Sequence, residues 1–251
     1  FTEVQCSMQN VIPYYKPLGL TPLQAIEKLK SERPELADVP ITYAGRLDPM
    51  AEGLLILLAG DAVHHKQEFL DLPKTYEAKI LLGFSSDTFD ILGIASLQQS
   101  KLQHKNPQEL ITAVKNLVGT HNFSYPPYSS KTVDGKPLWL LTREGKISAE
   151  ELPKREMTVL AAENIEIQDT SWQKVYTDIT STISLVNGDF RQSEILDCWS
   201  KINDTTASDK EFQVISVKFT VSSGTYIRTL AHELDGILLH LKRTSVGEYH
   251  L

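Results

Sequence analysis

Residues 41–58 read Ile-Thr-Tyr-Ala-Gly-Arg-Leu-Asp-Pro-Met-Ala-Glu-Gly-Leu-Leu-Ile-Leu-Leu. A short β-branched and aromatic piece leads to Gly45, which permits a tight or left-handed backbone. Asp48 stands before Pro49, and a residue in that place is pushed out of the α region. The apolar run 54–58 has the length of a strand and no polar face, which is typical of a strand covered on both sides. The pattern predicts a carboxylate on a stiff loop between two core strands, with an ordinary Asp-Pro turn as the alternative.

Length and composition place the chain among ordinary globular proteins. Its 251 residues suffice for one large domain or two small ones, and 41% hydrophobic with 23% charged residues is a usual balance. No apolar run approaches the roughly 20 residues that span a membrane, and the first residues show no secretory pattern. The two cysteines, Cys6 and Cys198, form neither a disulfide framework nor a metal-ligand cluster, so we expect a reducing cytoplasm.

The charge balance bears on nucleic acid as a partner. A net charge of −7 counts against such a partner, because phosphate contacts supply most of the affinity for nucleic acids. Net charge does not describe local patches, however, and the acidic stretch 204–211 lies far from residues 41–58 in the sequence. An RNA-binding function therefore requires a localised basic groove.

Helix and strand signals flank the central stretch. Thr21 can cap a helix, Pro22 suits its first position, and Gln24 stands where a capping box places it. The apolar residues of 76–82 alternate and predict a strand with one inward face. Asn106 begins a second capped helix.

The second half of the chain is predicted to be rich in strands. Residues 158–168 and 175–186 are enriched in β-branched side chains, which favours two strands. Strict alternation over 215–221 predicts a half-buried strand. A helix is then expected from Thr225, with an inward face that continues as far as Leu238.

Three stretches together resemble one enzyme family. Gly-Arg-Leu-Asp-Pro-Met-Ala-Glu-Gly at residues 45–53 resembles the G-x-L-D-P-x-A-x-G signature of pseudouridine synthases of the TruB family. Two further motifs follow in the family's order: a Lys-x-Tyr strand with Lys74 and Tyr76, and a Ser-x-Gly-Thr-Tyr-Ile-Arg segment with Tyr226 and Arg228. One such motif is a weak signal, whereas three in order are a strong one.

The resemblance implies a fold and a domain plan. The expected class is α/β (α+β), with a mixed, largely antiparallel sheet and flanking helices. Residues 1–251 are expected to form a single catalytic domain, with an RNA-contacting insertion at about 122–150 and a second insertion at about 170–212. The C-terminal PUA-like RNA-binding domain of many relatives is expected to be absent.

The resemblance also implies the chemistry. Pseudouridine forms when the N1–C1′ bond of uridine breaks and the rotated base rejoins through C5, which requires a carboxylate but no external oxidant, metal or phosphate donor. Asp48 would be that carboxylate, and the sequence leaves its point of attack open. Arg228 would pair with it, Tyr76 would stack on the extruded base, Lys74 would bind phosphate, and Tyr226 would belong to the same site.

Partners and cofactors follow from the same resemblance. The expected substrate is uridine 55 in the T-loop of tRNA, bound through the T-arm stem-loop. The protein is expected to be a monomer and to have no membrane partner. Weaker RNA contacts are assigned to Lys131, Lys136 and Arg143. No cofactor is expected, since the sequence has no phosphate loop and no Gly-x-Gly-x-x-Gly. No metal is expected either, because the neighbouring His64 and His65 point apart on a strand or helix.

Some positions depart from the family pattern and keep alternatives open. Tyr43-Ala44-Gly45 stands where the family usually has His-Thr-Gly, so Tyr43 would have to accommodate the flipped nucleotide. A second enzyme hypothesis pairs Asp48 with Glu52 as the carboxylates of a hydrolase, but the stretch has no sugar-stacking aromatic cluster. A third hypothesis is a non-catalytic RNA-binding or RNA-folding module on the same scaffold.

Overall fold

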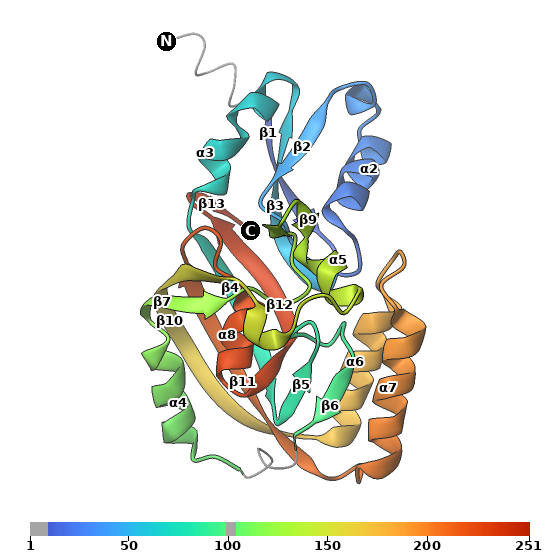
Figure 1. Cartoon of the computed structure of the whole chain (residues 1–251). Coiled ribbons are helices and arrows are strands. Elements are labelled where there is room, and N and C mark those ends of the chain that lie inside the picture. Colours follow the sequence, from blue (N-terminus) through green and yellow to red (C-terminus); the bar gives the residue numbers. More distant parts are fainter. Residues whose placement is uncertain (1–9, 99–103) are drawn as a thin grey trace.

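A computed structural model describes residues 10–98 and 104–251 of the chain (Figure 1), so Cys6 lies outside the described residues. The strands of its central sheet are β1 (Val11–Lys16), β2 (Ile41–Ala44), β3 (Ala51–Ala59), β4 (Lys74–Leu82), β7 (Gly119–Ser124), β10 (Lys154–Ser171), β11 (Glu211–Val221), β12 (Gly236–Val246) and β13 (Tyr249–His250). Their order is β1-β3-β12-β4-β11-β10-β7, with β2 paired to β3 and β13 paired to β12. Within this sheet only β3 and β12 run parallel to each other.

Helices and two small hairpins surround the sheet. The helices are α2 (Pro22–Glu32), α3 (Lys66–Leu70), α4 (Pro107–Asn116), α5 (Leu138–Arg143), α6 (Trp172–Ser184), α7 (Gln192–Thr205) and α8 (Ile227–Glu233). The small hairpins pair β5 (Phe84–Ser86) with β6 (Ala95–Leu97) and β8 (Thr132–Val133) with β9 (Lys136–Pro137). Helix α4 packs on β10 and α8 packs on β12. The predicted fold class, a largely antiparallel sheet with flanking helices, is confirmed. Among the described residues no helix is both long and apolar enough to cross a membrane.

The local signals of the first half are present in the structure. Leu54 to Leu58 lie in β3 and are buried. Strand β1 pairs along one edge of β3, and β2 and β12 pair with successive parts of the other edge, so β3 is an interior strand. Thr21 and Gln24 form the predicted capping box of α2. Asp48 and Pro49 lie in the connection between β2 and β3, which is the predicted loop between two strands.

Two predictions for the second half are wrong. Residues 175–186 belong to helix α6 for most of their length, because Val175, Ile179 and Ile183 recur every four residues and all three face the core. The C-terminal helix ends at Glu233 and does not continue to Leu238. Asp235 has a left-handed φ of 62°, and the chain then enters β12, where Ile237 and Leu238 pair with β4.

The helices α6 and α7 form an excursion between two strands that are already paired. The β10–β11 register runs up to Ser171 opposite Glu211, and the Trp172 N–H donates to the Lys210 carbonyl at 2.7 Å. The two helices therefore leave and re-enter the sheet at one place. Trp172 and Trp199 anchor them there against Phe84 and Phe212, with ring centroids 5.1 to 6.4 Å apart.

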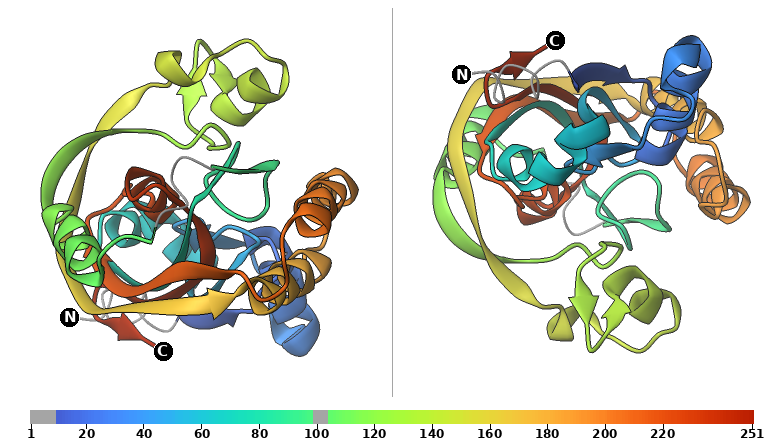
Figure 2. Two further views of the ribbon diagram at one scale, coloured as in Figure 1. Left: turned by 90° about the horizontal axis from the view of Figure 1, so that it is seen from below. Right: turned by 90° about the horizontal axis from the view of Figure 1, so that it is seen from above.

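A second excursion separates β7 from β10. Residues 125–153 carry the β8–β9 hairpin and α5, and in Figure 2 they project from the ends of β7 and β10, away from the body of the sheet. Asp134 and Gly135 both have positive φ, 48° and 78°, as the tight Asp-Gly turn between β8 and β9 requires. Tyr125, Leu138 and Leu152 form a small core of their own in this segment.

Gly53 allows β3 and β12 to approach each other closely, which makes this position sensitive to substitution. Its φ is +109°, and a Cβ there would lie 2.3 Å from the carbonyl oxygen of Arg243. We expect Gly53→Ala to lower the free energy of unfolding by about 3 kcal/mol or more. Gly135→Ala is the matched control, since its φ is also positive but nothing lies near a Cβ there. The control should cost about 1 kcal/mol.

Urea unfolding of both glycine variants measures the difference. Equal losses of stability would contradict the argument, because they would leave the close approach of the Arg243 carbonyl without any energetic effect.

Candidate active site

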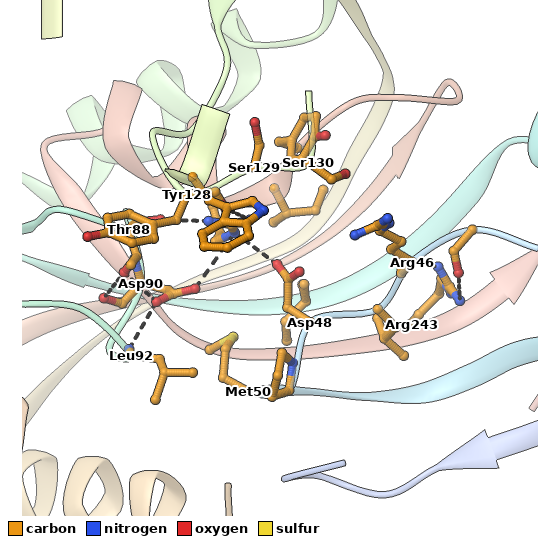
Figure 3. A pocket seen from close by; sticks show the side chains of 18 of the residues that line it. Arg46, Asp48, Met50, Thr88, Asp90, Leu92, Tyr128, Ser129, Ser130 and Arg243 are labelled. Carbon is orange, nitrogen blue, oxygen red and sulfur yellow. Dashed lines mark hydrogen bonds and ion pairs between the residues drawn. The ribbon is translucent and has the colours of Figure 1, made fainter. Parts of the chain in front are cut away.

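A cavity of about 630 Å³ opens between segments that are distant in the sequence (Figure 3). It is lined by the loop 45–50, by Leu70, Lys74, Tyr76, Thr88, Asp90 and Leu92, by Tyr128, Ser129, Ser130, Trp139 and Arg143, by residues 189–191, by residues 222–228, and by Leu241 and Arg243. The volume is in the range of small-molecule and cofactor sites.

Asp48 and Arg228 meet in this cavity. Asp48 lies on the β2–β3 loop with its side chain 40% exposed, and Arg228 lies in the first turn of α8 with its side chain 7% exposed. The Arg228 Nε atom is 2.9 Å from Asp48 Oδ2. This pair was expected from the sequence, and the structure brings the two residues together. A guanidinium so close to a carboxylate pairs with it and fixes its direction.

A second carboxylate, Asp90, contacts the same guanidinium. Its Oδ2 lies 3.7 Å from Arg228 Nε, the atom that is also 2.9 Å from Asp48. Asp90 is buried, and its Oδ1 accepts hydrogen bonds from the Thr88 hydroxyl at 2.6 Å and the Leu92 N–H at 2.9 Å. Sequence reasoning missed Asp90, which lies in a stretch without periodicity. The spacing Thr88-Phe-Asp90 was the only local signal, and it is a weak one.

Backbone carbonyls complete the environment of Arg228. Its Nη1 donates to the Thr88 carbonyl at 2.9 Å and its Nη2 donates to the Tyr128 carbonyl at 3.2 Å. The buried guanidinium is therefore surrounded by two carboxylates and two carbonyls from three separate segments. Such a charge is tolerated in the interior only because it is paired and hydrogen-bonded.

The titration of Asp90 gives a pH prediction. Burial raises the pKa of Asp90 to about 6, and the opposing effects of Arg228 and the Thr88 hydroxyl offset only part of this rise. The folded state thus favours the protonated carboxyl of Asp90. Its contribution to the free energy of unfolding is fully present below the ordinary pKa of 3.8 and is lost as the pH rises through 6. From pH 5 to pH 7.5 the wild type should lose about 1 kcal/mol of stability relative to Asp90→Asn.

Urea unfolding of the wild type and Asp90→Asn at the two pH values gives this difference directly. If the stability of the wild type relative to Asp90→Asn stayed constant or increased from pH 5 to pH 7.5, Asp90 would be ionised throughout, and the effect of Arg228 would outweigh that of burial.

Tyr76, Tyr226 and Arg143 also lie at the cavity. Tyr76 is buried on β4 and lines the wall, while Tyr226 precedes α8 with its ring edge toward Tyr125, at 5.6 Å between centroids. Burial raises the pKa of the Tyr226 phenol. Arg143 ends α5 and reaches the cavity from the 125–153 segment.

Other residues predicted for the site are placed differently. The Lys74 ammonium donates to the carbonyls of Leu70 and Leu72, at 2.5 and 2.6 Å, and burial lowers its pKa to about 8. Lys74 lines the cavity, but its ammonium is already engaged by these two carbonyls. Tyr43 does not line the cavity and packs under the ammonium of Lys66, at 5.1 Å from its ring centroid.

Lys131 and Lys136 of the projecting segment also lie outside the cavity wall. The Lys131 ammonium is 5.7 Å from the Tyr125 ring centroid, and Lys136 is exposed on β9. Neither side chain is in contact with Asp48. Their position leaves both side chains available to a bound molecule that is too large for the cavity and extends beyond it.

Two buried cations hold the loop that carries Asp48, and the sequence analysis assigned neither a role. Arg243 donates to the carbonyls of Leu54, Arg46 and Gly45. Lys16 donates to three further carbonyls, those of Pro17, Leu20 and Ala51, and burial lowers its pKa to about 8. Arg243 therefore binds the start of the loop, and Lys16 binds Ala51 directly after it.

The paired-carboxylate alternative has no geometric support. Glu52 does not line the cavity. Its carboxylate instead accepts from the Tyr15 hydroxyl and lies 3.0 Å from His240 Nε2. Asp48 and Glu52 thus do not face a common space. In the described part of the chain, no three His, Cys, Asp or Glu side chains gather as metal ligands.

Comparison with known proteins identifies relatives of the sequence. Residues 35–186 match the family described as "TruB family pseudouridylate synthase (N terminal domain)". A protein named tRNA pseudouridine synthase B from Caldicellulosiruptor saccharolyticus is 35% identical over 138 residues, which is 55% of this chain and 46% of the relative. Proteins of the same name from Nitratidesulfovibrio vulgaris and Cupriavidus metallidurans are 28% and 29% identical, over 87% and 97% of this chain. The matches span 55% and 64% of those two relatives, so the chain covers only part of the length of its relatives.

Solved structures share the fold. A chain described under "Crystal Structure of a Cbf5-Nop10-Gar1 Complex" matches 98% of this chain and 52% of its own length, with a TM-score of 0.55 at 17% identity. A chain in "Structure of H/ACA RNP bound to a substrate RNA containing 2'-deoxyuridine" matches 98% of this chain and 50% of its own, with a TM-score of 0.54 at 16% identity. At such identities the likeness concerns the fold alone.

Proposed function

Since this chain belongs to the TruB family of pseudouridylate synthases, we propose that it isomerises uridine to pseudouridine in RNA, with Asp48 as the catalytic carboxylate. The observation that carries the proposal is the placing of Asp48, which is partly exposed in a cavity and lies 2.9 Å from the buried Arg228. An ionised, fixed carboxylate is what cleavage at the sugar–base junction needs, as attacking group or as charge stabiliser.

The proposed substrate is tRNA, at uridine 55 of the T-loop. The relatives named tRNA pseudouridine synthase B support tRNA as the substrate, and the T-arm stem-loop is the finer part of the proposal. The target base has to leave its stack, which costs a few kcal/mol and less in a loop than in a helix. Tyr76 lies in the wall of the cavity, where it can stack on the extruded base.

Basic residues near the cavity account for RNA binding by an acidic chain. Arg46 and Arg143 line the cavity, and Lys131 and Lys136 lie farther out on the projecting segment. We assign this segment, about 122–150, to contact with the RNA backbone. Because these contacts are electrostatic, affinity should fall steeply as salt is raised. Tyr43 lies away from the cavity, so it acts on the RNA outside the flipped base or not at all.

The remaining parts of the proposal concern the setting of the reaction. We propose that the chain forms one catalytic domain, acts as a monomer in the cytoplasm, and needs no cofactor. The segment at about 170–212, which holds α6 and α7, is proposed as a second insertion.

The test is site-resolved mapping of pseudouridine in an unmodified tRNA transcript incubated with the protein. Conversion at position 55 is expected, and a transcript with cytidine at that position should show no product. Conversion at another uridine would keep the isomerase activity and refute the T-loop assignment. Tight tRNA binding without any conversion would favour a non-catalytic RNA-binding module.

A further inference from the structure

The loop between α6 and α7 lies at the catalytic cavity. We name residues 185–191 the hairpin tip; three of them, Asp189, Phe190 and Arg191, line the same cavity as Asp48. A connection of only a few residues would be enough to join the paired antiparallel strands β10 and β11. The pairing of these strands therefore does not explain why two helices lie between them. Helix α6 has 13 residues and extends roughly 20 Å from the end of the β10–β11 pairing. The helix pair carries the tip from the sheet to the active site.

On one side the hairpin tip contacts Gly19, which lies between β1 and α2 and is itself bound to the loop that carries Asp48. The Asn187 N–H donates to the Gly19 carbonyl at 2.9 Å, and the Gly19 N–H donates to the Pro49 carbonyl at 2.8 Å. The approach is close, since a Cβ on Gly19 would lie 2.0 Å from the carbonyl oxygen of Leu185. Pro49 follows Asp48 directly, so one residue separates the tip from the loop that carries the carboxylate.

On the other side Arg191 contacts two segments that hold Arg228. Its Nη1 lies 2.8 Å from Asp87 Oδ2, with both side chains largely buried. Its guanidinium carbon lies 4.5 Å from the Tyr128 ring centroid, a cation–π distance. Asp87 precedes Thr88, and the carbonyls of Thr88 and Tyr128 are the two that accept from Arg228. Arg191 therefore contacts both segments that supply these acceptors.

The hairpin tip is itself held in one conformation. Gln192 accepts from the Phe190 N–H at 2.8 Å and donates to the carbonyls of Val186 and Gly188 at 3.1 and 2.6 Å. Arg191 has a left-handed backbone, with φ of 62°. A tip fixed by its own hydrogen bonds can transmit position to its neighbours, which a loose loop cannot do.

We propose that Arg191 is a positioning residue for the reaction: by holding Asp87 and Tyr128 it fixes the carbonyls that aim Arg228 at Asp48. Arg191 does not act on the base in this arrangement, because its guanidinium is occupied by Asp87 and the Tyr128 ring. The reaction in question is the proposed uridine isomerisation, so the kinetic part of the inference rests on the proposed function. The structural part, that the tip orders residues 87–94 and 128–139, does not.

The kinetic test compares Arg191→Ala with Lys174→Ala. Lys174 lies on α6 away from the tip and makes an exposed ion pair with Asp178, so its loss removes a cation from the same helix pair at a residue that does not line the cavity. Arg191→Ala should lower kcat by about 10- to 100-fold, the usual effect of a small misplacement of reacting groups, with KM for tRNA nearly unchanged. Lys174→Ala should match the wild type in both constants.

Two further variants separate positioning from simple structural damage. Asp87→Asn removes the partner of Arg191, so its effect on kcat should not add to that of Arg191→Ala in the double variant. Arg191→Lys keeps the charge for Asp87 but loses the flat guanidinium over Tyr128, and should recover part of kcat. A raised KM with unchanged kcat in Arg191→Ala would overturn the proposal and make Arg191 a direct RNA contact.

Amide hydrogen exchange tests the structural part without any turnover. Amides of residues 87–94 and 128–139 should exchange faster in Arg191→Ala than in the wild type or Lys174→Ala. Among them are the Ile94 N–H, bound to Asp87 Oδ1 at 2.8 Å, and the Trp139 N–H, bound to the Ser129 carbonyl at 3.1 Å. Unchanged exchange would overturn the proposal. A wild type that makes no pseudouridine would refute the proposed function alone, and the exchange result would still decide on Arg191.

Discussion

Replacing Asp48 by asparagine is expected to abolish uridine conversion and to leave tRNA binding almost unchanged. The amide has nearly the shape of the carboxylate, and its oxygen can still face Arg228. It has no negative charge, so it can neither attack carbon nor stabilise positive charge at the sugar. Losing a group of this kind lowers the rate by roughly 10⁴-fold or more. The fold should persist, because Asp48 is partly exposed and Arg228 keeps Asp90 as a partner.

Single-turnover conversion of a tRNA transcript measures the rate, and filter binding measures the affinity. Asp48→Glu is the matched control, since it keeps the charge but moves it by one methylene. It should also be strongly impaired, because the loop around Asp48 is held by Arg243 and Lys16 and cannot readjust. An Asp48→Asn protein that converts uridine at the wild-type rate would remove Asp48 from the chemistry.

Replacing Arg228 by methionine is expected to cost both stability and activity. Methionine roughly fills the space but leaves the buried Asp90 without its counter-charge, and breaking a buried ion pair in this way typically costs about 3–5 kcal/mol. The carbonyls of Thr88 and Tyr128 also lose their donor. Conversion should fall by about 10²- to 10³-fold, the usual effect of removing a fixed electrostatic partner from an active site.

The double variant Arg228→Met with Asp90→Asn separates the two effects. A neutral amide at position 90 needs no counter-cation, so thermal unfolding should recover much of the lost stability. Activity should remain low, because Asp48 still lacks the group that aims it. If the double variant recovered conversion along with stability, Arg228 would have only a structural role, and the pairing with Asp48 would not matter to the reaction.

The parts of the fold that could be predicted are those whose sequence patterns lie within a short stretch of the chain. The apolar run of β3, the capping box of α2 and the alternation of β11 are each complete within about ten residues, and all three were predicted correctly. Residues 175–186 were predicted as strand because β-branched composition was given more weight than their four-residue spacing. The spacing decides in the folded chain, because it places Val175, Ile179 and Ile183 on one buried face.

For the active site, the sequence alone was enough to single out Asp48, Tyr76 and Arg228 through ordered motifs, and the family match is consistent with that resemblance. It could not show that Asp90 shares the guanidinium, that the Lys74 ammonium is bound by the Leu70 carbonyl, or that Arg191 touches the Tyr128 ring. Local periodicity and capping depend on neighbours in the chain, so the sequence displays them directly. Burial and ion pairing depend on which distant segments meet, and only the tertiary structure decides that.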